Sequence, residues 1–147
     1  MVSKKKVQLK IECSHEAIVK ENSSHFMTHD WTVVVKGTDG ADISRVLDKV
    51  VFNLHASFVE PKRTCQDPPY MVKEDGYGSF TLPIDIYFKT STNGDIRRRR
   101  INYNLSLQMV GLPTLNCTTM KAFTFVNPSE EFEKRLLDAG AVILPSE

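Results

Sequence analysis

Alternation of apolar and polar residues with a period of two is the feature that most limits how this chain can fold. It is clearest over residues 101–109, where apolar side chains alternate with asparagine, serine and glutamine. The apolar set is Ile101, Tyr103, Leu105, Leu107 and Met109. A period of two places successive side chains on opposite faces of a strand, so this segment is predicted to be a half-buried β-strand. Similar patterns predict further strands over residues 7–11, 17–20, 31–35, 50–54, 84–88 and 123–125.

Turn residues separate these short strands, and they favour an all-β fold. Asn93-Gly94 is typical of a tight type I′ hairpin turn, which joins antiparallel strands. Several short strands punctuated in this way indicate a β-sandwich or a β-barrel. The chain has 147 residues, which is enough for one domain with a substantial core.

A short helix is predicted near the C-terminus, over about residues 128–139. Asn127-Pro128-Ser129-Glu130 combines a capping side chain, a proline at the first helical position and an acid in the first turn. Gly140 is suited to end the helix. We therefore expect a basic tail over residues 1–6, one domain over residues 7–140, and a second tail over residues 141–147.

Composition and cysteine spacing exclude several classes of protein. The formal net charge is +1, whereas a protein that binds nucleic acid mainly through phosphates is usually far more basic. No apolar run approaches the ~20 residues of a membrane span, and no signal peptide is evident, so a cytosolic or nuclear location is expected. Cys13, Cys65 and Cys117 are far apart, which predicts reduced and mostly buried thiols. The histidines have no metal-ligand spacing, so no metal site and no cofactor are expected.

One segment, residues 55–80, follows neither the strand period nor the helix period. It is rich in proline, glycine and aromatic residues, and we interpret it as two long loops. Aromatic loops on a rigid β-scaffold usually bind something.

Six ordered motifs in and around this segment resemble the YEATS domain family. They are Thr28-His29-Asp30-Trp31, residues 50–58, Pro61-Lys62-Arg63, Asp67-Pro68-Pro69-Tyr70, residues 74–80 and residues 83–88. Several motifs at matching spacing are far more specific than one motif alone. The segment after Val126 also resembles the closing helix of the ENL type of this family.

The resemblance implies an immunoglobulin-like antiparallel β-sandwich that reads acylated lysine on histone tails in the nucleus. It implies binding of acetylated or crotonylated lysine on histone H3, through a pocket of aromatic and small residues. By residue-for-residue match the pocket consists of His55, Ser57, Phe58, Gly76, Tyr77, Gly78 and Phe80, together with Met27, which replaces an aromatic residue of the family. The ENL type also has an acid at the position of Asn104, where it meets an arginine of the histone peptide. Relatives of this type join transcription elongation or chromatin-modifying complexes through a separate segment that nothing here resembles.

Other interpretations of the same residues are weaker. His55 and Ser57 lack both a nucleophile elbow and an evident orienting acid, so an enzyme is not expected. Gly76-Tyr77-Gly78 lacks the third glycine and the following helix of a phosphate-binding loop. A plain interaction scaffold of a chromatin complex, with a non-functional acyl pocket, stays open as an alternative, because the fold alone does not decide function.

A run of four arginines is the one strong concentration of charge. Arg97, Arg98, Arg99 and Arg100 lie at the start of a predicted strand, so their side chains are expected to point to both faces. One interpretation is a solvated strand end. The other is an auxiliary contact with nucleosomal DNA.

Overall fold

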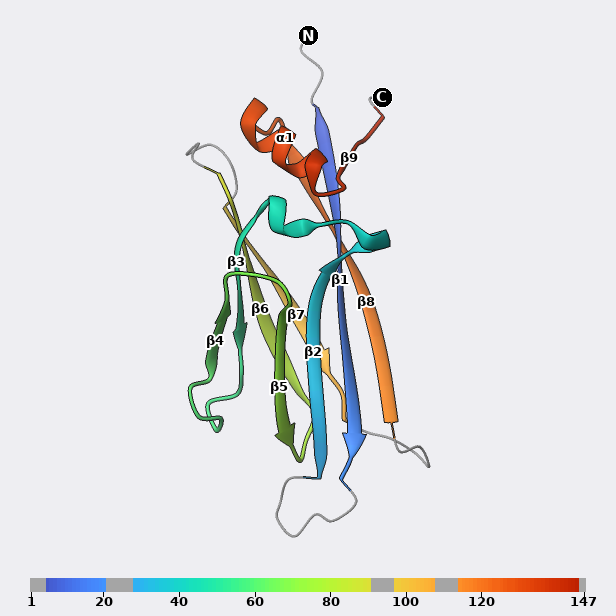
Figure 1. Cartoon of the computed structure of the whole chain (residues 1–147), viewed down its shortest axis with the longest axis vertical. Coiled ribbons are helices and arrows are strands. Elements are labelled where there is room, and N and C mark those ends of the chain that lie inside the picture. Colours follow the sequence, from blue (N-terminus) through green and yellow to red (C-terminus); the bar gives the residue numbers. More distant parts are fainter. Residues whose placement is uncertain (1–4, 21–27, 91–96, 108–113, 146–147) are drawn as a thin grey trace.

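Two antiparallel β-sheets packed against each other form the domain (Figure 1). The computed structural model describes residues 5–20, 28–90, 97–107 and 114–145. The strands are β1 Lys6–Val19, β2 His29–Gly37, β3 Leu47–Asn53, β4 Lys62–Cys65, β5 Tyr70–Gly76, β6 Phe80–Phe88, β7 Arg98–Leu105, β8 Thr114–Val126 and β9 Val142–Ile143. One sheet has the order β5-β2-β1-β8, with β9 also paired to β1, and the other has the order β4-β3-β6-β7. The predicted immunoglobulin-like sandwich is confirmed.

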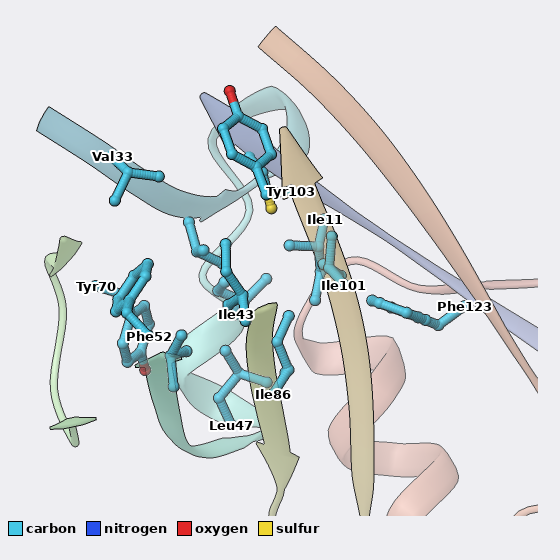
Figure 2. Packing of buried hydrophobic residues seen from close by; sticks show 14 of the residues in the cluster. Ile11, Val33, Ile43, Leu47, Phe52, Tyr70, Ile86, Ile101, Tyr103 and Phe123 are labelled. Carbon is cyan, nitrogen blue, oxygen red and sulfur yellow. The ribbon is translucent and has the colours of Figure 1, made fainter. Parts of the chain in front are cut away.

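The core lies between the two sheets and follows the alternation seen in the sequence. Val7, Leu9 and Ile11 on β1 are at most 1% exposed, whereas Gln8 is half-buried and Lys10 is exposed. Figure 2 shows Ile11 of one sheet and Phe52 and Ile86 of the other among the packed side chains. Burial of these apolar side chains on both inner faces holds the sheets together.

Strand β1 is longer than the sequence predicts. In the sequence the alternation of apolar and polar residues breaks after Cys13, so a separate strand is predicted at residues 17–20. The structure instead has one continuous strand of 14 residues. His15 occupies an inward position and is only 3% exposed, so a polar residue takes the place of an apolar one without ending the strand.

Residues 55–80 contain two strands as well as loops, which corrects the expectation of two long loops. β4 is short and its residues are exposed or half-buried, so the sequence has no alternation of apolar and polar residues there that would predict a strand. β5 follows directly after Pro68-Pro69 and pairs with β2. The Asn93-Gly94 turn and Met109 lie outside the described residues, and β6 and β7 on either side of that turn pair antiparallel as expected.

The C-terminal helix α1 (Glu130–Asp138) covers one end of the sandwich (Figure 1). Its N-cap is Ser129, whose hydroxyl accepts a hydrogen bond from the Phe132 N–H at 3.2 Å, and not Asn127 as the sequence suggests. Phe132 packs its ring against Phe125, with the centroids 5.1 Å apart. Gly140 follows the helix with a φ of 100°, a conformation that favours glycine.

Two further expectations are modified. Residues 141–147 are expected to be a tail, but Val142–Ile143 form β9, which pairs with β1.

The cysteines are less buried than expected. All three are free, yet only Cys13 is fully buried, and this burial raises the pKa of its thiol to about 12. Within the described part of the chain, no helix is long and apolar enough to cross a membrane.

Candidate functional site

A cavity of about 210 Å³ opens at the end of the sandwich opposite α1, where the β3–β4 loop and the β5–β6 turn emerge (Figure 1). It is lined by His55, Ser57, Phe58, Gly76, Tyr77, Gly78, Ser79 and Phe80. The structure thus brings together the seven predicted pocket residues that it describes, while Met27 lies outside the described residues. Ser79 is an addition that the sequence analysis missed, although it lies inside one of the recognised motifs.

His55 and Ser57 are joined in the β3–β4 loop. The Ser57 backbone N–H donates to Nδ1 of His55 at 3.1 Å, so this ring nitrogen is an acceptor. The Ser57 hydroxyl lies 2.9 Å from the same nitrogen and therefore donates to it as well. Because its proton is used in this way, the Ser57 oxygen presents lone pairs that can accept a hydrogen bond from a ligand.

Arg63 on β4 holds the outer part of this loop. Its guanidinium donates to the carbonyl oxygens of Glu60 at 2.6 Å and Val59 at 2.9 Å. It also pairs with the Glu74 carboxylate on β5 at 2.5 Å. One side chain thus ties the loop that carries Phe58 to a strand of the opposite sheet, which explains the Pro61-Lys62-Arg63 motif in structural terms.

Phe58 forms a supported aromatic wall of the cavity. Its ring lies 6.0 Å from that of Trp31 in an edge-on arrangement and 5.9 Å from that of Phe80. Trp31 is 1% exposed and belongs to the core. Phe58 is therefore half core residue and half pocket residue, and its position depends on the packing beneath it.

Tyr77 lines the cavity from the β5–β6 turn and is 67% exposed. Among the described residues, none accepts a hydrogen bond from the backbone N–H of Tyr77 or Gly78. These two donors lie in the part of the chain that lines the cavity, so they can bind an oxygen of a ligand.

The two glycines that flank Tyr77 have different roles. Neither has a positive φ, so neither is required for backbone conformation. A β-carbon on Gly76 would lie 3.1 Å from Nε1 of Trp31, whereas one on Gly78 would have nothing within 4 Å. Gly76 is therefore needed for close packing against the indole ring.

This difference predicts contrasting effects of two alanine substitutions. Gly76→Ala is expected to lower the free energy of unfolding by about 1–2 kcal/mol, because the added methyl group crowds Trp31. Gly78→Ala is the matched control and is expected to change it by less than about 0.5 kcal/mol. Urea denaturation of both variants measures the effect, and equal stabilities would contradict the packing role of Gly76.

The four arginines of residues 97–100 do not form one surface patch, because most of them are bound to different partners. Arg99 donates to the Thr124 carbonyl oxygen at 3.0 Å, with its guanidinium 5.1 Å from the centre of the Phe125 ring. Arg100 forms two hydrogen bonds with the Asp85 carboxylate, at 2.7 and 2.9 Å. Arg97 donates to the Thr90 carbonyl, and Arg98 is exposed. Contact with DNA stays a prediction, and Arg98 is the member of the run best placed for it.

Asn104 is exposed on β7 and pairs with Thr81, the residue after Phe80. Asn104 therefore lies close to the cavity along the strand, but it does not line the cavity.

The site has neither an acid that orients His55 nor a metal centre among the described residues. In the described ranges, no carboxylate is bonded to His55, and no three His, Cys, Asp or Glu residues are grouped to hold a metal ion.

Comparison with known sequences finds a matching family and several relatives. Residues 26–109 match the sequence model of the YEATS family. The chain is 44% identical to Protein AF-9 of Homo sapiens over 141 residues, which is 95% of this chain but only 24% of that protein. It is 31% identical to transcription initiation factor TFIID subunit 14b of Arabidopsis thaliana, covering 85% of this chain and 48% of that protein. The chain thus spans about a quarter of the length of AF-9.

Solved structures with a similar fold include two of the Yaf9 YEATS domain. One, described as recognising an H3K122suc peptide, has a TM-score of 0.79 and 30% sequence identity. The other, bound to H3K27ac, has a TM-score of 0.80 and 28% identity. Each comparison covers 93% of this chain and 97% of the other.

Proposed function

Because the chain belongs to the YEATS family, we propose that it reads acetylated or crotonylated lysine on histone H3 tails and is not an enzyme. The observation that carries this proposal is a cavity lined by residues of both the β3–β4 loop and the β5–β6 turn, with aromatic walls, hydrogen-bond donors and a hydrogen-bond acceptor. Its volume of about 210 Å³ is below the roughly 300–1,000 Å³ of pockets for drug-sized ligands. It therefore suits the end of one modified side chain.

The chemistry of acylated lysine matches this lining. Acylation removes the ammonium charge and leaves a flat amide at the end of an apolar stem. An unpaired ammonium group would be very costly to bury, whereas the amide needs only its hydrogen bonds. The Ser57 oxygen can accept from the amide N–H, and the backbone N–H groups of Tyr77 and Gly78 can donate to the acyl oxygen. Phe58 and Tyr77 supply apolar surface for the amide plane.

The wider role is part of the same proposal. The Yaf9 domains were solved with acylated H3 peptides, and relatives include a subunit of a transcription initiation factor. We propose by analogy that this chain acts in the nucleus and links histone acylation to transcription. Membership of a transcription elongation or chromatin-modifying complex would depend on segments that are not in this sequence.

Calorimetric titration with matched H3 peptides tests the proposal. Peptides of one sequence, carrying unmodified, acetylated or crotonylated lysine, differ only in the group that enters the cavity. We expect a dissociation constant on the order of 10 μM for an acylated peptide and no measurable binding of the unmodified one. Equal affinity for modified and unmodified peptides, or no binding at all, would favour the alternative of an interaction scaffold with a non-functional pocket.

Asn104 gives a prediction about the peptide sequence around the lysine. Asn104→Asp is expected to tighten binding of a peptide with a nearby arginine by about 1 kcal/mol, because a neutral contact becomes charge-assisted. A peptide with that arginine replaced by glutamine is the control and should not respond. Unchanged affinity for the arginine peptide would remove Asn104 from the binding surface.

A further inference from the structure

A buried histidine lies outside the cavity and does not line it. His15 on β1 is 3% exposed. Its Nδ1 lies 2.6 Å from the Tyr103 hydroxyl, and its Nε2 lies 2.8 Å from the carbonyl oxygen of Ser106. Figure 2 shows the Tyr103 hydroxyl pointing away from the aliphatic side chains of the core, in keeping with a polar contact at the core's edge.

The partners of His15 determine the direction of both hydrogen bonds. A carbonyl oxygen only accepts, so Nε2 carries a proton and donates to Ser106. In the neutral ring Nδ1 is then an acceptor, and the Tyr103 hydroxyl donates to it. The hydroxyl lies farther from its other acceptor, the Cys117 carbonyl, at 3.5 Å.

The segment bound by His15 continues directly to the pocket. Leu107, the residue after Ser106, donates its backbone N–H to the Ser79 hydroxyl oxygen at 2.7 Å. Its side chain is 2% exposed, and its Cδ1 would lie 3.5 Å from a β-carbon placed on Gly76. Leu107 therefore contacts the β5–β6 turn on both sides of Tyr77-Gly78.

Tyr77 needs support of this kind. Its side chain is 67% exposed, so packing of its own ring does little to fix its position. The ring direction instead follows from the backbone of residues 76–79. Gly76 is held on one side through the Thr28 N–H, which donates to its carbonyl oxygen at 3.0 Å, and Ser79 is held on the other side by Leu107.

We propose that His15 is a positioning residue for the acyl-lysine pocket. Through the Ser106 carbonyl it fixes residues 106–107, which brace the β5–β6 turn from behind and set the direction of the Tyr77 wall. The inference rests on the proposed function, since it assigns His15 a role in that same site. A purely structural histidine would contribute to stability without affecting affinity.

Three substitutions separate these roles. His15→Gln can place its amide nitrogen where Nε2 lies and keep the bond to Ser106, whereas the shorter His15→Asn cannot reach it. Tyr103→Phe removes only the hydroxyl that donates to Nδ1 and is the matched control for loss of stability. We expect His15→Asn to weaken binding of an acetylated H3 peptide about tenfold, equivalent to about 1.4 kcal/mol. His15→Gln and Tyr103→Phe should bind within about twofold of the original chain.

Amide hydrogen exchange gives a second readout that needs no ligand. His15→Asn should accelerate exchange at Leu107, whose N–H is hydrogen-bonded to the Ser79 hydroxyl oxygen, and Tyr103→Phe should not. Ser79→Ala should reproduce the faster exchange at Leu107, because it removes the hydroxyl that accepts the hydrogen bond from the Leu107 N–H. If His15→Asn does not fold, His15→Gln decides the question: protection retained at Leu107 supports the brace, and protection lost there overturns it.

The outcomes also separate this inference from the proposed function. If the original chain binds acylated peptide and His15→Asn binds equally well with unchanged exchange, His15 has no positioning role. If the original chain binds no acylated peptide, the proposed function fails, while the exchange measurements still confirm or refute the brace.

Discussion

Tyr77→Ala is expected to weaken binding of an acylated H3 peptide strongly while leaving the domain folded. Loss of one aromatic wall should reduce the binding free energy by about 1–3 kcal/mol, which raises a dissociation constant near 10 μM by roughly five- to 150-fold. Stability should change little, because the side chain is 67% exposed. Calorimetric titration together with a thermal melt measures both quantities.

Tyr87→Ala is the matched control for this experiment. Tyr87 lies on β6, does not line the cavity and instead packs beneath the Lys49 ammonium, 4.7 Å from the ring centre. The same chemical change there should leave peptide affinity unaltered. A folded Tyr77→Ala variant with the original affinity would contradict the assignment of Tyr77 to the pocket.

Phe58→Ala is expected to reduce both affinity and stability. Both Phe58 and Tyr77 are predicted pocket residues, but the Phe58 ring also contacts Trp31 and Phe80. Removing its ring should therefore lower the free energy of unfolding by about 1–3 kcal/mol in addition to the loss of binding. Denaturant unfolding compared between the two alanine variants checks this, and equal stability would show that the ring does not support the core.

The second large effect concerns an ion pair on the outer face of the four-stranded sheet. Asp85 is 4% exposed, and its carboxylate is held by Arg100 and by the side-chain amide of Asn53 at 3.1 Å. Arg100→Gln would leave this charge buried with one weaker partner. We expect a loss of about 2–4 kcal/mol of unfolding free energy, toward the lower end because the Arg100 side chain is 47% exposed. Arg98→Gln, which changes an exposed neighbour, should stay within about 0.5 kcal/mol of the original chain.

The same pair predicts a dependence of stability on pH. Hydrogen bonds from Arg100 hold the pKa of the Asp85 carboxyl below its ordinary value of 3.8, against the opposing effect of burial. A carboxyl with a lowered pKa in the folded state stabilises the protein above its unfolded pKa, and this contribution is lost as pH falls through the folded pKa. The stability difference between the original chain and Arg100→Gln should therefore be full at neutral pH and shrink below about pH 4. A difference that does not depend on pH would exclude the carboxylate as its source.

The sequence predicted those parts of the fold in which apolar residues alternate without interruption. The continuity of β1 was not predicted, because His15 places a polar side chain at an inward position. Its hydrogen bonds are made with Tyr103 and Ser106, which lie about ninety positions away in the chain. The sequence analysis also missed β4, whose exposed side chains have no apolar face.

The pocket could not have been derived from periodicity at all. His55 and Tyr77 belong to separate loops, and only the resemblance to a family placed them together before the structure did. Ser79 was overlooked because its hydroxyl accepts a hydrogen bond from the backbone N–H of Leu107, just after β7, a contact that no local pattern reveals.

Arg99 has a consequence for the behaviour of the protein in solution. Strand β8 is the last strand of its sheet, and the backbone groups along such a strand can pair with a second molecule. Arg99 occupies the Thr124 carbonyl and places a charge over that border, while Lys121 on the same strand is exposed. Charged side chains at a sheet border oppose strand-to-strand association between copies. We therefore expect Arg99, part of the basic run that suggests DNA contact in the sequence, to oppose aggregation through the edge of β8.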